Sequence, residues 1–384
     1  MSTMDIRPVF SEPQAASSGT SQLCSGADIL RHADDIEQDP QLRSALVAMS
    51  GGVDSTVAAL LASREGIDCA GAMMRLHAQS AKAESDAQEA CGQLGIPYYT
   101  LDYTEAFSKL VILPFVTAYR EGRTPNPCVD CNRSLKFGLL IEKARELGKD
   151  LLITGHYARV ARDSNGRFLL KKAADASKDQ SYVLYSLTQE QLAYIHFPLG
   201  ELSKQEVRRL AADAELDNAL KRESQDICFI PGGDYAGFIS EYTGEAARKG
   251  RFVDEDGNDL GEHRGIGCYT IGQRHGLGLA MPYPPYVINI RPDDGRIVVG
   301  RSESLLSKAF YMRDINLIPC DKLDSPIRAR VKIRYKHSGQ PATVAQTGED
   351  TLFVEFDEPQ RAITKGQAAV IYDGETVVGG GTIV

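Results

Sequence analysis

Two short stretches of the chain combine residue types that carry chemistry at close spacing. The first is SGGVDST at 50–56, in which two glycines, a carboxylate and hydroxyl side chains interrupt an apolar run. The residues before it, 46–49, are typical of a strand buried on both faces, and apolar residues at helical spacing follow it. Such a turn brings unpaired backbone N–H groups and the positive end of a helix dipole together, which predicts an anion site. An ordinary turn in which Ser55 or Thr56 caps the helix has the same pattern.

The second stretch, GRTPNPCVDCNRSLKFG at 122–138, carries Cys128 and Cys131 directly after a Pro-Asn-Pro loop. A CxxC pair can be half of a zinc site, a redox dithiol or a coincidence, and the chain has no second pair at the spacing that zinc needs. A third thiol, Cys228, stands in KRESQDICFIPGG at 221–233, where its apolar neighbours are typical of a buried structural cysteine. The residue types alone leave structural, redox and nucleophilic uses of these thiols open.

The elements that must position these residues alternate between strand and helix from residue 46 to about 222, which predicts a parallel sheet with helices on both faces. We expect strands at 46–49, 69–74, 97–101 and 150–155, and helices after residue 56, at 85–94 and from about Asn132. The strand at 150–155 ends in a glycine, at the edge where ligands bind in such sheets. The SGGVDST turn lacks both the lysine of a P-loop and the GxGxxG fingerprint, so it predicts a different kind of phosphate turn.

Length and composition indicate a globular protein of two or three domains. The chain has 384 residues, of which 42% are apolar and 25% are charged, and it contains no apolar run long enough for a membrane span. Residues 1–41 carry seven acidic residues against two arginines, which is unlike a signal or transit peptide and predicts a disordered extension. Eight scattered cysteines fit a reduced cytoplasm, and the net charge of −9 argues against indiscriminate nucleic-acid binding.

The composition and the predicted secondary structure of the chain change after Cys228. Residues 231–305 are rich in glycine and short strands, and from about 310 short alternating strands predict a small β-barrel. Within it, PIRARVKIRYKHSG at 326–339 alternates basic residues with smaller, apolar or aromatic ones, so one strand would place all five cations on one face. Such a face is either a solvated surface or a patch that binds RNA phosphates. The five cations are Arg328, Arg330, Lys332, Arg334 and Lys336.

Seven motifs in order identify a family resemblance over roughly residues 44–384. They are AMSGGVDST, GRTPNPCVDCN, TGHYARV, KDQSYVLYSL, SQDICFIP, YTIGQRHGLG and GQAAVIYDGE. SGGVDST resembles the PP-loop of the ATP pyrophosphatase superfamily, and the set as a whole resembles the tRNA-specific 2-thiouridylase family. The resemblance implies a doubly wound parallel α/β sheet of the adenine nucleotide alpha hydrolase-like type. A small central domain and a C-terminal β-barrel would follow, with boundaries at 1–41 (extension), 42–230 (catalytic), 231–308 (central) and 309–384 (barrel).

The same resemblance implies a sulfurtransferase that acts on the wobble uridine of tRNA. Its members adenylate the carbon-2 carbonyl with ATP, which acts with Mg²⁺, and replace the oxygen with sulfur from a cysteine persulfide. The products are 2-thiouridine, AMP and pyrophosphate. Implied partners are tRNA and a persulfide donor such as a cysteine desulfurase or a sulfur-relay protein, and neither a membrane nor a resident metal site is expected.

Family roles carry over to this chain position by position. Cys131 matches the nucleophile and Cys228 the cysteine that carries the persulfide. The ATP-contacting positions are Ala48, Met49, Ser50, Gly51, Gly52, Val53, Asp54, Ser55, Met74 and Gly155. Asn126, Pro127 and Cys128 match positions that contact the target base, and His156, Lys178, Asp179, Gln180, Arg334, Tyr335 and Gln367 match positions that contact tRNA.

Two departures from the family pattern bear on the mechanism. Some members have aspartate where this chain has Cys128, so the CxxC pair contains a rival to Cys131, and the usual Lys-Asn after Met74 is replaced by Arg75-Leu76. Because a free thiol is only a few per cent thiolate at neutral pH, we expect the site to lower the pKa of its cysteine.

Three other functions fit parts of the pattern. A PP-loop ligase that uses no sulfur would not require the second and third thiols, Cys131 and Cys228. A non-catalytic RNA-binding protein would not require an intact SGGVDS turn. A redox protein that uses the CxxC pair would leave both the ATP turn and the basic stretch unexplained.

Overall fold

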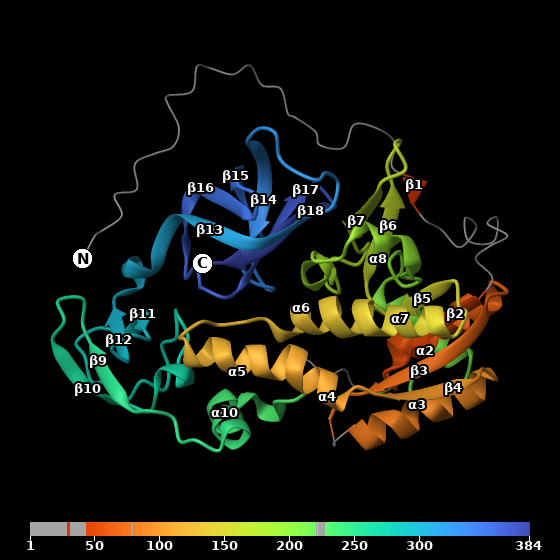
Figure 1. The fold of residues 1–384 in the computed structure, drawn as a ribbon, viewed down its shortest axis with the longest axis horizontal. Helices are drawn as coiled ribbons and strands as arrows, with labels where there is room; N and C mark the ends of the chain where they lie inside the picture. The colour runs from red at the N-terminus through yellow and green to blue at the C-terminus, as the bar shows by residue number, and fades with distance from the viewer. Residues whose placement is uncertain (1–28, 31–43, 78–79, 220, 222–226) are drawn as a thin grey trace.

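The structure, a computed structural model, describes residues 29–30, 44–77, 80–219, 221 and 227–384. Figure 1 shows an α/β region, a small sheet at one end of the molecule and a barrel above the helices that join them. The predicted fold class is confirmed, because a doubly wound parallel sheet is followed by a small β-region and a closed barrel. Within the predicted extension, Ile29–Leu30 (β1) pairs antiparallel with Ala158–Arg162 (β6); the other residues of 1–41 lie outside the described part.

The α/β region is built on five parallel strands in the order β4-β3-β2-β5-β8. Their bounds are Tyr98–Asp102 (β4), Asp68–Arg75 (β3), Ser44–Ala48 (β2), Leu151–Thr154 (β5) and Ile195–His196 (β8). The chain runs outward from β2 in one direction and then returns to add β5 and β8 on the other side. The strand order therefore reverses between β2 and β5, which is where ligands bind in sheets of this kind.

Alternate residues of the central strands point to opposite faces of the sheet and pack in two separate hydrophobic cores. Val47 and Ile153 pack with Val53–Arg64 (α2), Ala81–Leu94 (α3) and Lys204–Asp213 (α9) on one face. Leu46 and Leu152 face the other layer, which includes Leu113–Arg120 (α5) and Leu140–Glu146 (α7) together with Thr104–Phe107 (α4) and Gln189–Tyr194 (α8). Burial on both faces explains why these strands read as continuous apolar runs rather than as alternating ones.

The helix that bears the CxxC pair begins earlier than its sequence pattern indicated. Pro127–Cys131 (α6) continues through Asn132–Leu139, which has π-type hydrogen bonding, into α7. The side chain of Asn126 caps the helix by accepting from the Cys128 backbone N–H at 3.2 Å, and Pro127 occupies the first helical position. The expected start near Asn132 is wrong, because the Asn-Pro pair forms a cap and both cysteines belong to the first turns of the helix.

The C-terminal region is a six-stranded antiparallel barrel that closes in the order β13-β16-β15-β14-β17-β18. Its strands are Leu306–Leu317, Ile327–Lys332, Gln340–Gly348, Thr351–Arg361, Ala368–Asp373 and Thr376–Ile383 for β13 to β18. The hairpin of β6 with Phe168–Lys172 (β7) reaches from the α/β region and pairs with β18 through Thr376 and Lys171. The barrel and the α/β region are thereby joined by a shared sheet.

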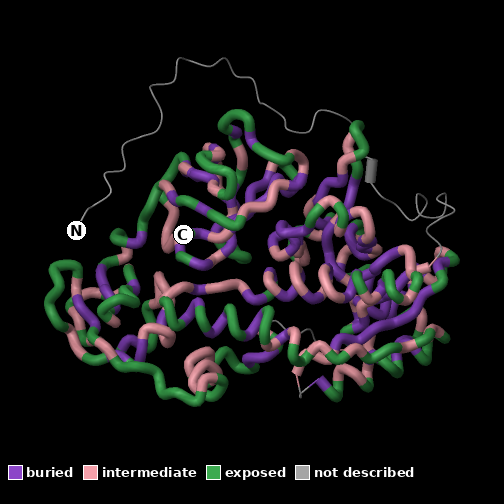
Figure 2. The backbone as a smooth tube through the Cα atoms, viewed as in Figure 1, coloured by how far each residue is buried: buried purple, intermediate pink, exposed green. Residues whose placement is uncertain are grey.

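A separate four-stranded sheet forms the small central region at the left of Figure 1. Its order is β10-β9-β12-β11, with bounds Asp259–His263, Gly250–Val253, Arg296–Gly300 and Tyr286–Arg291. Tyr235–Thr243 (α10) connects it to the α/β region. Figure 2 shows buried residues along the parallel sheet, and buried residues mixed with exposed ones along the barrel strands. Among the described residues, no helix is both long and apolar enough to cross a membrane.

Candidate active site

The SGGVDST turn joins β2 to α2 at the point where the strand order reverses. Gly51 has a φ of +68°, and a Cβ there would lie 2.6 Å from the carbonyl oxygen of Ala83, so only glycine fits. Gly52 is the N-cap of α2, and no side chain caps the helix. The hydroxyls of Ser55 and Thr56 instead donate to the Gly52 carbonyl, at 3.0 and 3.1 Å. The capping interpretation is therefore wrong, and the first-turn N–H groups retain their capacity to bind an anion.

A second glycine brings β5 against this turn. A Cβ on Gly155 would lie 2.7 Å from the backbone nitrogen of Ser55 and 2.7 Å from the carbonyl carbon of Asp54, so a side chain would push the helix away. Two residues later, the hydroxyl of Tyr157 donates to Oδ1 of Asp54 at 2.8 Å. The ends of β2 and β5 are thus fixed to each other at the first turn of α2.

Two lysines that sequence analysis missed also contact the turn. Nζ of Lys204 lies 2.7 Å from Oδ1 of Asp54, and its residue is only 8% exposed. Nζ of Lys221 donates to the Gly51 carbonyl at 2.9 Å and also pairs with Asp86. Both lysines lie more than 140 positions after the turn in the sequence, so no short motif could indicate their contact with it. The S-K-x-E capping pattern at 203–206 was the available signal for a helix that starts here.

The ATP-site positions that were expected from the family lie at the carboxyl ends of neighbouring strands. Ala48 ends β2, Met49 and Ser50 follow it, and Met74 lies near the end of β3. Arg75, which replaces the usual lysine, forms two hydrogen bonds with Glu84 through Nη2, at 2.9 and 3.0 Å, and contacts it through Nε as well. This Arg75–Glu84 pair ties β3 to α3, so the departure from the family pattern has a structural role.

The segments that bear the three thiols pack together, because Cys131 shares one hydrophobic cluster with Phe229 and Ile230, which follow Cys228. Cys128 is exposed on the first turn of α6, Cys131 is buried one turn later, and Cys228 is exposed near the start of the described stretch 227–384. Burial, followed by the charge of Cys131 and Cys128, raises the pKa of the Cys228 thiol to about 11. The described cysteines are all free.

The expected lowering of the thiol pKa is contradicted. Burial raises the pKa of Cys131 and of Cys128, because the surrounding protein atoms remove solvent from sulfur even where part of the residue reaches the surface. Lys136, one turn further along the helix, is the largest influence in the opposite direction for both thiols. The protein alone therefore keeps these cysteines as thiols at neutral pH.

The loop before α6 is held by the barrel. The backbone N–H of Thr124 donates to the carbonyl of Lys365 at 2.9 Å, and Nε2 of Gln367 donates to the Thr124 carbonyl at 3.0 Å. Gly366 has a φ of +88°, and a Cβ there would lie 3.0 Å from the Thr124 nitrogen. Gln367, which was predicted to contact tRNA, thus has a defined protein partner next to the predicted base-contacting residue Asn126.

His156 is placed differently from an RNA-facing side chain. It is buried, with Nδ1 2.7 Å from Oγ1 of Thr154, and its ring contacts Phe137 and Phe197. Burial holds the pKa of His156 well below its usual value, so the ring is neutral at physiological pH. His156 is therefore a core residue, and its contacts join β5 to the helix that bears the cysteines.

The remaining predicted tRNA positions gather where the KDQSY segment meets the barrel. Asp179 accepts from the N–H and the hydroxyl of Ser181, and Gln180 accepts from the Tyr157 N–H at 2.9 Å. Tyr335 is exposed and its hydroxyl lies 3.4 Å from the Asp179 carbonyl. Lys178 is partly buried, and the exposed Arg334 donates to the carbonyl of Arg361 at 3.2 Å.

The basic stretch does not form one strand face as expected. Strand β14 ends at Lys332, so Arg334 and Lys336 lie in the turn that follows. Arg328 pairs with Asp357 at 2.6 Å, and the Lys332 ammonium lies about 6 Å or less from the centres of three tyrosine rings. The strand pattern failed because a tight turn interrupts it, and Arg334 and Lys336 are the exposed cations of that turn.

Comparisons with known proteins agree with this arrangement along the chain. Family models match residues 43–232 (tRNA methyl transferase HUP domain), 236–301 (tRNA methyl transferase PRC-barrel domain) and 307–383 (Aminomethyltransferase beta-barrel domain). The tRNA-specific 2-thiouridylase MnmA of Clostridioides difficile is 44% identical over 353 residues, which cover 89% of this chain and 98% of the relative. The chain belongs to the tRNA-specific 2-thiouridylase family.

Two further members are similarly close. The tRNA-specific 2-thiouridylase MnmA of Carboxydothermus hydrogenoformans is 45% identical, and the alignment covers 89% of this chain and 97% of the relative. The tRNA-specific 2-thiouridylase MnmA 1 of Caldanaerobacter subterraneus is 46% identical, with coverage of 88% and 97%. As a member of the 2-thiouridylase family, this chain is a sulfurtransferase, and the suggested resemblance is confirmed.

The contact at Gly155 generates a prediction for nucleotide binding. We expect Gly155→Ala to lower the free energy of unfolding by about 1–3 kcal/mol and to weaken ATP binding, because the added methyl displaces the first turn of α2. Gly92→Ala is the control, since Gly92 lies inside α3 with nothing within 4 Å of an added Cβ; it should stabilise by about 0.5–1 kcal/mol. Chemical denaturation and calorimetric titration with ATP measure both effects. Equal behaviour of the two variants would contradict the proposed contact.

Proposed function

We propose that this protein replaces the carbon-2 oxygen of the wobble uridine of tRNA with sulfur, in a reaction that consumes ATP. The observation that carries this proposal is that Cys131 packs in one hydrophobic cluster with Phe229 and Ile230, the neighbours of Cys228, in a fold that also has an uncapped glycine turn at its switch point. A ligase without sulfur chemistry would need the turn but not the thiols. Family membership supports tRNA as the substrate.

The residues of the turn are suited to hold the phosphates of ATP. The N–H groups at the start of α2 carry no side-chain cap, and the ammonium groups of Lys204 and Lys221 lie beside the turn. Ala48, Met49, Met74 and Gly155 would complete the nucleotide site from the ends of three adjacent strands. When bound, ATP supplies the adenylation that turns the uridine oxygen into a leaving group.

Mg²⁺ would be held by Asp54 together with the phosphates. Magnesium commonly takes one or two carboxylates and keeps the rest of its shell from phosphate and water. Oδ1 of Asp54 already accepts from Tyr157 and Lys204, so Oδ2 is the oxygen suited to the ion. Among the described residues, no group of three or more His, Cys, Asp or Glu side chains could form a metal site without substrate.

Cys131 and Cys228 divide the sulfur chemistry between them. Cys228 receives a persulfide from a donor such as a cysteine desulfurase or a sulfur-relay protein, and it is exposed whereas Cys131 is buried. Cys131 as thiolate attacks the inner sulfur of that persulfide, which forms a Cys131–Cys228 bond and breaks the persulfide bond. The hydrosulfide that leaves attacks carbon-2 and expels AMP, and a thiol reductant then restores both cysteines.

Substrate binding must help to create the reactive thiolate, because the protein alone raises the pKa of Cys131. Lys136 is the cation placed to stabilise that charge. Asn126, Pro127 and Cys128 would contact the base, which must leave its stack to be attacked. The residues that would shape the tRNA surface around it are Lys178, Asp179, Gln180, Arg334, Tyr335, His156 and Gln367. Of these, the buried His156 would act through packing, and Gln367 donates to the Thr124 carbonyl.

Nucleoside analysis of tRNA tests the proposed function. Unmodified tRNA incubated with protein, ATP, Mg²⁺ and a persulfide source should yield 2-thiouridine, detected by mass spectrometry after digestion, with AMP and pyrophosphate in equal amounts. Cys131→Ser and Cys228→Ser should abolish the product. Cys128→Ser should retain most of it, because some family members have aspartate at that position and a carboxylate cannot carry sulfur.

The pattern among the three variants separates this assignment from its rivals. Full thiolation by Cys131→Ser together with loss of thiolation in Cys128→Ser would show that Cys128, and not Cys131, is the nucleophile of the CxxC pair. ATP consumption without any 2-thiouridine from the unaltered protein would favour a ligase that uses no sulfur. Cys320→Ser is a matched control, since Cys320 lies at the barrel, away from the motifs.

The position of Arg334 generates a prediction for tRNA affinity. We expect Arg334→Gln to weaken tRNA binding and to reduce the log–log salt slope by about 0.7–0.9, the value of one phosphate contact. Arg328→Gln should leave the slope nearly unchanged, because Arg328 is already paired with Asp357. Titrations at several salt concentrations measure the slope. An unchanged slope in Arg334→Gln would remove this arginine from the tRNA surface.

A further inference from the structure

Lys204 is a buried cation whose partner is the acidic residue of the phosphate-binding turn. Its ammonium is 2.7 Å from Oδ1 of Asp54, and Tyr157 donates to the same oxygen at 2.8 Å. The ammonium also lies 5.8 Å from the centre of the Tyr157 ring. Lys204 belongs to none of the motifs that indicated the family, and its position is set by tertiary structure alone.

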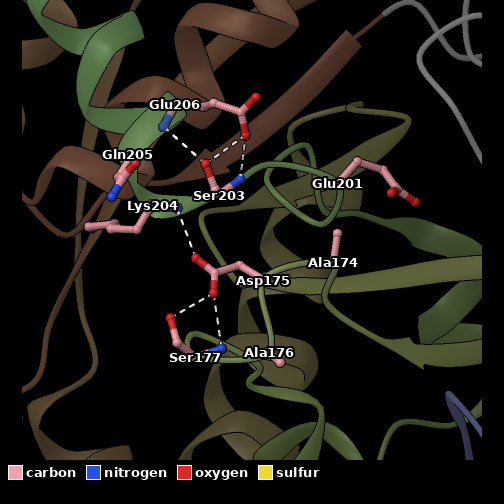
Figure 3. A pocket seen from close by; sticks show the side chains of 9 residues that line it. All are labelled: Ala174, Asp175, Ala176, Ser177, Glu201, Ser203, Lys204, Gln205 and Glu206. Carbon is pink, nitrogen blue, oxygen red and sulfur yellow. Dashed lines mark hydrogen bonds between the residues drawn. The ribbon is translucent and has the colours of Figure 1, made fainter.

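The fold places this lysine with several backbone constraints. Lys204 is the first residue of α9, behind a capping box in which Ser203 and Glu206 bond to each other's backbone N–H groups. Oδ2 of Asp175 accepts from the Lys204 N–H at 3.1 Å and thereby ties the helix start to the loop at 175–177. Figure 3 shows these bonds. Lys204 is one of the residues that line the pocket beside them, whose volume is about 680 Å³.

Packing alone does not account for an ion pair here. Replacing a buried pair by apolar residues is often neutral or stabilising, so a lysine is not needed merely to hold α9 against the sheet. The pair instead lies at the helix start that would receive phosphate. An unneutralised Asp54 in that first turn would repel a polyphosphate, because like charges a few ångströms apart in a partly buried site interact strongly.

We propose that Lys204 is a positioning residue of the ATP site. It cancels the charge of Asp54 and fixes Oδ1, so that the turn accepts the negative phosphates while Oδ2 faces a cation. Lys204 acts through Asp54 and not by direct contact with the nucleotide. This inference rests on the proposed use of ATP.

Binding of α,β-methylene-ATP with Mg²⁺ tests this role without turnover, since the analogue cannot be cleaved at the bond that adenylation breaks. We expect Lys204→Met to raise the dissociation constant by at least about 30-fold, the typical effect of removing one partner of a buried charge pair. Arg208→Met is the matched control, because Arg208 is an exposed cation on the same helix; its dissociation constant should change less than about twofold.

A double-mutant cycle with Asp54→Asn defines the mechanism and also covers the case in which Lys204→Met fails to fold. In the Asp54→Asn background the lysine has no charge to cancel, so adding Lys204→Met should change analogue binding less than about threefold. Equal losses in both backgrounds would overturn the proposal, because Lys204 would then act on the phosphates directly. Unchanged binding by Lys204→Met alone would also overturn it. Failure of the unaltered protein to bind the analogue would instead refute the proposed ATP site.

Discussion

The loop that leads into the helix of the cysteines is held by all three parts of the molecule, and the placement of the thiols depends on this constraint. A Cβ on Gly122 would lie 2.6 Å from the side chain of Ile290 in the central sheet, and the barrel grips Thr124 through Lys365 and Gln367. On the other side of the cysteines, Nδ2 of Asn132 donates to the carbonyl of Val183. A chain held at so many points can present Cys128 and Cys131 in one orientation at the start of a helix.

A second set of contacts connects the phosphate turn with the segment that leads to Cys228. After α9 the chain passes over the turn, where Asn218 donates to Oγ1 of Thr56 at 2.8 Å and Lys221 to the Gly51 carbonyl at 2.9 Å. His156, next to Gly155, packs against Phe137 in the helix that carries Cys131. The proposed ATP site therefore contacts both segments that bear the reactive thiols, which gives nucleotide binding a physical route to influence them.

The sequence predicted the local features of this site more successfully than its long-range ones. The strands at the sheet centre, the SGGVDST turn, the strand end at Gly155 and the barrel follow from apolar runs and turn residues that are close together along the chain. Lys204 and Lys221 could not be inferred, because their partners Asp54 and Gly51 are distant in sequence and only the folded sheet brings them together.

The other errors have equally specific physical causes. The helix start at Pro127 was missed because the Asn-Pro cap looks like an ordinary loop in a single sequence. The strand expected through Arg334 is interrupted by a turn after Lys332, which alternation of charge does not reveal. The pKa of the reactive cysteine was expected to be low because the chemistry needs a thiolate. Burial instead removes solvent from the Cys131 thiol and raises its pKa.

Peptide mapping after a single turnover tests the central claim, that Cys131 and Cys228 meet during sulfur transfer. The protein would be loaded with persulfide on Cys228, mixed with tRNA and ATP without reductant, and digested after alkylation of free thiols. The account predicts a Cys131–Cys228 disulfide in proportion to the 2-thiouridine formed, with the two Cα atoms within about 4.4–6.8 Å of each other in that state. A Cys128–Cys131 disulfide in its place, or 2-thiouridine formed while both cysteines remain separate, would contradict it.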